Sequence, residues 1–148
     1  MLTAEELCDI CGVTPNKRQA WSRDGELRQR RGFEELDAVE LTTYAALREI
    51  AGPSRAKAAW ADLRGELARL LLDTPRDVWI VVEAKGVMRH RLVVRTRDLA
   101  RAIEHGRPVH VLQLRPLVDA ARAAYREVAG RKRTARTAGS VTSLGDRR

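Results

Sequence analysis

The chain has 148 residues, a formal net charge of +8 and a pI near 10.4, a length that allows one or two small domains with a modest core. No apolar run approaches the roughly 20 residues that span a bilayer, and the N-terminal MLTAEEL lacks the basic start and long apolar centre of a signal peptide. We therefore expect a cytoplasmic protein that makes no membrane contact and whose two cysteines stay reduced.

Two short helical patterns joined by a three-residue turn open the chain. Thr3 can cap the first helix, and Glu6, three residues later, can return the hydrogen bond. Gly12 is expected to end this helix, because only glycine enters a left-handed turn without steric cost. Thr14 can cap a second helix that begins at Pro15, where the missing N–H costs nothing.

The second helix is expected to run to about Asp24, with Ala20 and Trp21 facing inward and its polar side chains left for solvent or a partner. Asn and Gln can pair with adenine, and Arg with guanine, in the major groove of DNA. A basic segment at residues 28–33 follows and can reach phosphates or the minor groove. The candidate DNA-binding residues are Thr14, Asn16, Lys17, Arg18, Gln19, Arg23, Arg28, Arg30 and Arg31.

The order of motifs over residues 2 to about 52 is also specific. Gly12-Val13-Thr14 is followed by Trp21, by Gly25 and Leu27, by the arginine-rich segment, and then by Phe33 and a helix with Val39, Leu41, Leu47 and Ile50. This order resembles the winged-helix domain of the MerR (mercury-resistance regulator) and phage-excisionase superfamily. The resemblance implies a helix-turn-helix and an arginine-rich wing, and it covers about a third of the chain. Arg18 stands where such domains usually have an aliphatic core residue.

The charge is concentrated in two segments. Residues 15–33 carry six basic and two acidic side chains, or +4, and residues 131–148 carry six and one, or +5, which leaves −1 for the rest. Two basic regions on a nearly neutral body are typical of phosphate binding. The alternative is that genomic base composition produced them, since Ala and Arg are abundant throughout the chain.

Two more helices are expected before residue 73. Asp37 can cap the first, which Gly52-Pro53 can end, and Ser54 can start the second. An apolar stripe on the second helix is long for so small a protein, and it predicts a contact with another subunit, as in a homodimer, or with a second domain. The alternative is packing on the winged helix alone. The stripe consists of Trp60, Leu63, Leu67, Leu70 and Leu71.

The pattern changes after Asp73-Thr74-Pro75, because the residue before proline avoids helix. Strands are expected at residues 78–82 and 89–96, on either side of a turn at Lys85-Gly86. A helix up to about residue 105, a third strand and a last helix follow. This β-β-α-β-α order predicts a small α+β domain that binds another subunit, a partner protein or a small effector.

The fold class predicted for the whole chain is therefore α+β, in four parts. The tail has almost no apolar residues to offset the entropy of ordering, so we expect it to be disordered. The parts are a winged helix-turn-helix at 1–53, a linking and dimerisation helix at 54–75, the small α+β domain at 76–130 and the basic tail at 131–148.

Other residue patterns give little support for catalysis. Cys8 and Cys11 form a Cys-x-x-Cys, but a metal site needs two more ligands. Glu83-Ala84-Lys85 is similar to the Glu-x-Lys of metal-dependent nucleases, but no acidic residue is well placed on a preceding strand. The sequence has no glycine-rich phosphate loop and no arguable nucleophile with a base. We expect no enzymatic activity, no metal and no cofactor.

The sequence thus predicts a nucleoid-associated transcriptional regulator that binds double-stranded DNA in a sequence-specific manner. One alternative stays within DNA binding, namely an excisionase-like architectural factor that bends DNA for a recombinase. Another is an adaptor that acts through its C-terminal domain.

Overall fold

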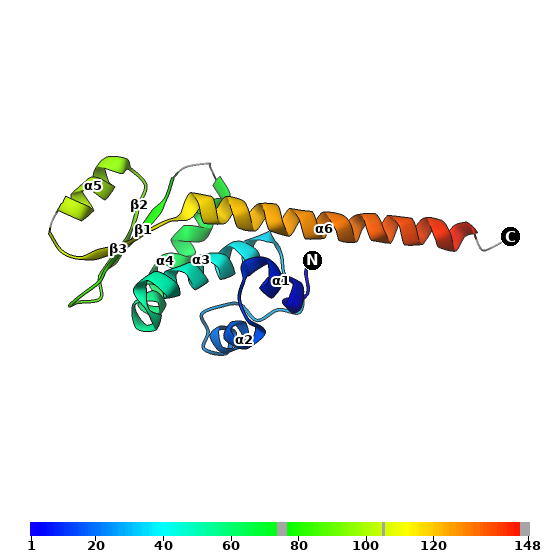
Figure 1. Cartoon of the computed structure of the whole chain (residues 1–148), viewed down its shortest axis with the longest axis horizontal. Helices are drawn as coiled ribbons and strands as arrows, with labels where there is room; N and C mark the ends of the chain where they lie inside the picture. The colour runs from blue at the N-terminus through cyan, green and yellow to red at the C-terminus, as the bar shows by residue number, and fades with distance from the viewer. Residues whose placement is uncertain (74–76, 105, 146–148) are drawn as a thin grey trace.

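The computed structural model describes residues 1–73, 77–104 and 106–145, and these ranges contain six α-helices and a three-stranded antiparallel sheet (Figure 1). The α+β class is therefore confirmed. The elements are α1 (Ala4–Cys11), α2 (Pro15–Arg23), α3 (Glu35–Ala51), α4 (Pro53–Asp73), β1 (Trp79–Glu83), β2 (His90–Val93), α5 (Thr96–Glu104), β3 (Val109–Gln113) and α6 (Leu114–Gly145).

The start of the chain follows its local sequence signals. The backbone N–H of Glu6 donates to Thr3 Oγ1 at 3.2 Å, and the N–H of Thr3 donates to Glu6 Oε2 at 2.8 Å. Gly12 ends α1 in the left-handed region with a φ of 65°. Thr14 caps α2, which begins at Pro15. The capping box, the glycine stop and the proline start are all confirmed.

The segment between α2 and α3, hereafter the α2–α3 loop (residues 24–34), is where a wing was expected. Its only strand-like pairing among the described residues is an isolated bridge between Phe33 and Leu2, with N···O distances of 2.9 and 3.0 Å. Both side chains are buried. The arginine-rich segment is therefore a loop anchored at its end by Phe33, and not a β-hairpin.

Two helix starts differ from the expected ones. Glu34, not Asp37, caps α3, and the Asp37 carboxylate accepts a hydrogen bond from the Glu34 N–H at 2.8 Å. Asp37 therefore acts as the third-position partner of a capping box, a role that an acidic residue in the first turn can fill equally well. Helix α4 begins at Pro53, directly after Gly52, because proline is well tolerated at the first helical position.

One hydrophobic core joins the N-terminal helices to β1 and α6. Tyr44 of α3, Ile80 of β1 and Val118 of α6 are fully buried in it. Trp60, Leu63 and Leu67 of the apolar stripe are buried in the same core, and Leu70 packs at its edge. The stripe is thus packed in the chain's own core, where α4 lies against α3 and β2, and its described part is not a free dimerisation surface. The side chain of Leu71 and residues 74–76 lie outside the described residues.

The sheet has the order β2-β1-β3, with β1 in the centre. Since side chains alternate between the two faces of a strand, Ile80 and Val82 face the main core while Val81 lies on the opposite face. There Val81, Val93 and Ala102 form a second small apolar cluster under α5. The sheet is thus covered on one face by the main core and on the other, in part, by the nine-residue α5.

Helix α6 has 32 residues and runs from the sheet past α1 (Figure 1). The prediction that the tail is disordered from residue 131 is therefore wrong for residues 131–145; residues 146–148 lie outside the described part. Arg, Lys and Ala are good helix formers, and Arg131 pairs with Glu127 one turn before it. Lys132 also donates to Glu6 Oε2 at 2.9 Å and to the Met1 carbonyl at 3.1 Å. None of the described helices has the length and apolar character needed to cross a membrane.

Candidate nucleic-acid interface

Helices α1 and α2 are held together by the turn between them. Val13 is buried, and its N–H donates to the Cys8 carbonyl at 3.1 Å. From α2, Trp21 enters the core, where its ring meets that of Tyr44 edge to face at a centroid distance of 5.1 Å. The inner side of α2 is therefore fixed on the rest of the chain, which leaves the outer side with a defined orientation.

The outer side of α2 is polar and exposed. Asn16, Lys17, Gln19 and Arg23 are all exposed to solvent, as the helical pattern predicts. Thr14 is exposed as well, but its hydroxyl already accepts from the Lys17 N–H at 3.4 Å as the helix cap. The structure thus brings two amides and two cations together on one short helix.

Arg18 lies differently from these neighbours. It is half-buried, and its guanidinium carbon is 5.2 Å from the centre of the Phe33 ring. Its Nε is buried without a hydrogen-bond partner among the described residues. The thiol of Cys8 is close by: burial raises its pKa, and the charge of Arg18 partly opposes that rise. Arg18 thus takes an inward, cation–π position, where the resembling domains usually have an aliphatic residue.

Two of the three candidate arginines in the α2–α3 loop are paired with buried carboxylates. Arg28 lies 3.6 Å from Glu40, and Arg30 lies 3.7 Å from Asp37. Burial raises the pKa of Glu40, while Arg64 at 3.5 Å and Arg28 oppose the rise. Arg31 is exposed and forms no ion pair with any residue that the structure describes. The positive charge of this loop is therefore partly neutralised from within.

Sequence reasoning missed a polar cluster at the end of α2. The buried carboxylate of Glu26 accepts a hydrogen bond from the Tyr44 hydroxyl, and Lys57 and Arg48 lie 3.7 and 3.9 Å from it. The Glu26 carbonyl accepts from Trp60 Nε1 at 2.7 Å. A buried charge needs such partners. The available sequence signal was the pair Tyr44 and Arg48, which lie one turn apart on an otherwise apolar helix face.

A second basic surface lies on α6. Residues 131–145 include four basic and no acidic side chains. Lys132 contacts α1 through Glu6, so this surface begins beside α1. Helix α6 then continues away from the body of the molecule (Figure 1). Its basic side chains are Arg131, Lys132, Arg133 and Arg136.

The two cysteines are packing residues in this structure. Cys8 is buried, and Cys11 Sγ donates to the Ala38 carbonyl at 3.5 Å. Burial raises the pKa of Cys11 to about 11, which keeps it a neutral thiol at neutral pH. Within the described ranges, no three His, Cys, Asp or Glu side chains come together in a way that could hold a metal ion.

No protein-family model and no curated protein sequence matches the chain.

Proposed function

We propose that the protein is a sequence-specific binder of double-stranded DNA, most simply a nucleoid-associated transcriptional regulator of the MerR-like winged-helix type. The observation that carries the proposal is the outer side of α2. Asn16 and Gln19 offer paired donors and acceptors for base edges, while Lys17 and Arg23 offer positive charge beside them. A buried Trp21 and a tight turn hold this helix rigidly, as base readout requires.

The distribution of charge supports the same proposal. Arg31 of the α2–α3 loop is exposed and unpaired among the described residues, and Arg28 and Arg30 still expose 41% of their side chains. The basic segment of α6 adds four cations, beginning at Lys132, which contacts α1. Phosphate contacts from these two regions would position α2 without reading sequence themselves.

A second DNA-binding function deserves equal testing, namely an excisionase-like factor that bends DNA for a recombinase. One observation favours it: most of the α4 stripe is buried inside the chain, which removes one of the two dimerisation surfaces expected from the sequence. Monomers that line up along DNA need no such surface. Both functions place α2 in the major groove, and they differ in the number of subunits and in the shape of the DNA.

Selection of bound sites from a random DNA pool tests the proposal directly. We expect the full chain to enrich a recurring motif, which DNase footprinting then locates. A gel-shift assay with circularly permuted fragments measures bending, which separates the architectural factor from the regulator. If the pool yields no motif, sequence-specific binding is wrong. If the full chain binds no DNA at all, an adaptor that acts through the sheet and α5 becomes the better hypothesis.

A further inference from the structure

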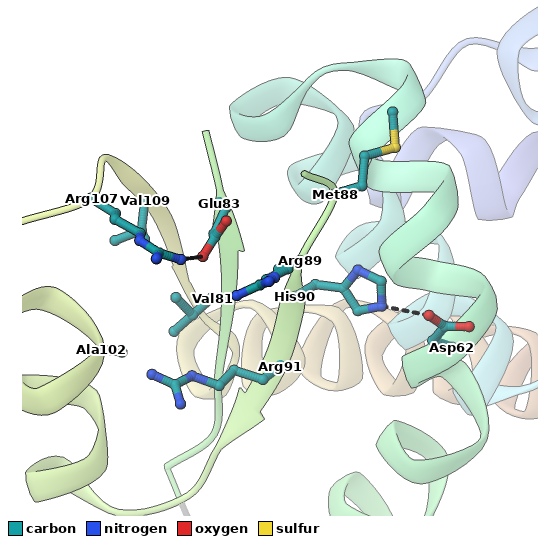
Figure 2. A pocket seen from close by; sticks show the side chains of 10 residues that line it. All are labelled: Asp62, Val81, Glu83, Met88, Arg89, His90, Arg91, Ala102, Arg107 and Val109. Atoms are coloured by element: carbon teal, nitrogen blue, oxygen red, sulfur yellow. Dashed lines mark hydrogen bonds and ion pairs between the residues drawn. The ribbon is translucent and has the colours of Figure 1, made fainter. Parts of the chain in front are cut away.

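A cavity of about 710 Å³ extends over the face of the sheet that α5 partly covers and around the β2 edge to Asp62 of α4 (Figure 2). Val81 of β1, Val109 of β3 and Ala102 of α5 supply its apolar lining. The cavity exists because α5 is short and covers only part of this face. Its volume lies within the range of about 300–1,000 Å³ that is typical of small-molecule sites.

Strand register explains why arginines surround this apolar lining. Arg91 pairs across the sheet with Val81, and the Glu83 N–H donates to the Arg89 carbonyl at 2.9 Å. Alternation along the strand therefore places Arg89 and Arg91 on the Val81 face. His90 points the opposite way, toward α4, where its Nε2 lies 2.6 Å from the Asp62 carboxylate (Figure 2).

The charge around the cavity is unbalanced. Among the described residues, two carboxylates line the cavity and both have partners: Glu83 pairs with Arg107 at 3.3 Å, and Asp62 lies 2.6 Å from His90. Arg89 and Arg91 are exposed and form no ion pair with any residue that the structure describes. These two guanidinium groups therefore place unpaired positive charge beside an apolar surface.

The turn that carries these arginines is held in place from the neighbouring helix. Arg55 of α4 donates to the Glu83 carbonyl at 2.9 Å and to the Gly86 carbonyl at 3.0 Å. These two bonds fix the end of β1 and the turn that leads to β2. The arginine side chains therefore start from a preorganised backbone, which lowers the entropy lost on binding.

We propose that this cavity binds a small carboxylate with an apolar body. The carboxylate lies between Arg89 and Arg91, since a planar guanidinium pairs with a carboxylate through two parallel hydrogen bonds. The apolar body packs against Val81, Ala102 and Val109. This site goes beyond DNA binding and does not depend on it, because its residues belong to the sheet and α5.

The test uses the full chain without DNA, titrated with benzoate, naphthoate and octanoate and followed by two-dimensional NMR of backbone and arginine side-chain N–H groups. We expect saturable shifts at Val81, Arg91 and Ala102. Naphthamide, which keeps the ring and removes the charge, should bind at least about tenfold more weakly than naphthoate. Binding by none of the three carboxylates at about 1 mM would overturn the proposal, as would equal affinity for the amide or equal shifts with inorganic phosphate.

Two variants locate the site. Arg91→Gln should weaken naphthoate binding by at least about tenfold, whereas Arg97→Gln, an exposed arginine on α5 that does not line the cavity, should leave it unchanged. Ala102→Leu, which narrows the apolar part of the cavity, should weaken naphthoate binding while the spectrum stays dispersed. Equal affinities of the Arg91 and Arg97 variants would overturn the assignment. None of these titrations uses DNA. A chain that binds no carboxylate can therefore still bind DNA, and a chain that binds no DNA can still bind a carboxylate in this cavity.

Discussion

Glu26 is 7% exposed, yet it carries a carboxylate that meets three side chains from two helices. It follows α2 by three residues, so its contacts to Tyr44, Arg48 and Lys57 fix the end of α2 on α3 and α4. Trp60 adds a hydrogen bond to its carbonyl. Removing one partner of such a buried cluster leaves an uncompensated polar group, which costs more than the contact itself contributes.

Tyr44 makes this cluster sensitive to alkaline pH. Burial, together with the hydrogen bond to Glu26, raises the pKa of Tyr44 from 10.0 to about 12. A raised folded-state pKa means that the stabilisation is complete below pH 10 and is lost as the pH rises toward 12. Urea unfolding between these pH values should therefore show a falling free energy of unfolding, and Tyr44→Phe should reduce that fall.

The same variant should lose about 1–3 kcal/mol of stability at neutral pH, because Glu26 then lacks its hydroxyl donor. The raised pKa of Cys11 also lowers the free energy of unfolding at alkaline pH. It does so equally in the wild type and in Tyr44→Phe, so the difference between the two proteins reports on Tyr44. An identical alkaline loss in the wild type and the variant would contradict the role given to Tyr44.

Asn16 and Gln19 of α2 are the side chains proposed to contact base edges. Asn16→Ala and Gln19→Ala should each lower affinity for the selected site by about 1–3 kcal/mol and barely change binding to random DNA, because base contacts carry the sequence information. Gln113→Ala, an exposed glutamine of β3, is the matched control and should change neither. Fluorescence anisotropy on both DNAs measures the effect. Equal losses on the two DNAs would show that these side chains read no base.

At the scale of elements, the α2–α3 loop divides its arginines into two kinds. Arg28 and Arg30 are paired with Glu40 and Asp37, whereas Arg31 forms no such pair within the described ranges. Arg31→Ala should therefore reduce the slope of log affinity against log salt by roughly one unit, the value for one lost phosphate contact. Arg28→Ala should reduce it less, because Glu40 already competes for that guanidinium. An unchanged slope for Arg31→Ala would remove the loop from the interface.

Because most of the α4 stripe is buried in the main core, substitutions in it should lower the stability of the fold and not simply prevent dimerisation. Leu67 is 2% exposed in the main core, so Leu67→Ala should lose about 2–5 kcal/mol of unfolding free energy, measured with urea. Glu66→Ala changes the exposed neighbour and should cost far less. Replacing Leu67 with Glu would unfold the chain and not simply separate subunits, contrary to what the sequence alone suggested. A small loss for Leu67→Ala would mean that this part of the core is loosely packed.

The elements also show what sequence could and could not predict. The caps at Thr3 and Thr14 and the stop at Gly12 were predictable because their partners lie within a few residues. The stripe of α4 was recognised, but periodicity shows only that a face is buried and not what covers it. The ion pair between Arg28 and Glu40 could not be predicted from local sequence, because it joins the α2–α3 loop to α3. The disorder predicted for residues 131–148 was based on their low apolar content alone. Their Arg, Lys and Ala residues are also good helix formers, and α6 continues to Gly145.

In the molecule as a whole, α6 connects the sheet to α1 and α3. It starts directly after β3, and the hydroxyl of Tyr125 donates to the Phe33 carbonyl and to Glu34 at 3.4 and 3.2 Å. Arg126 pairs with Glu35 at 2.7 Å, and Lys132 reaches Glu6. One continuous helix therefore contacts the loop before α3, the start of α3 and α1. The sheet therefore cannot move relative to α1 without changing these contacts.

Self-association must use surfaces other than the buried part of the α4 stripe. In the described part of the chain, the exposed large apolar side chains other than Met1 all belong to the sheet and α5 unit: Val87, Met88, Val94, Ile103 and Val111. Exposed apolar side chains of this kind favour a protein contact. We therefore expect a homodimer formed through this unit, with a DNA site that is an inverted repeat whose half-sites lie about one helical turn apart, or a multiple of that.

Ile103→Glu tests that expectation with little risk to the fold, because Ile103 is 52% exposed. The variant should sediment as a monomer at micromolar concentration, keep its unfolding free energy, and lose most of its affinity for the selected site, since one half-site alone buries little DNA surface. Ala61→Glu, on the exposed side of α4, should remain a dimer. If the wild type itself is monomeric and protects a single asymmetric half-site or a head-to-tail array, the symmetric dimer is wrong. The excisionase-like function would then account better for a chain whose α4 stripe is largely consumed by its own core.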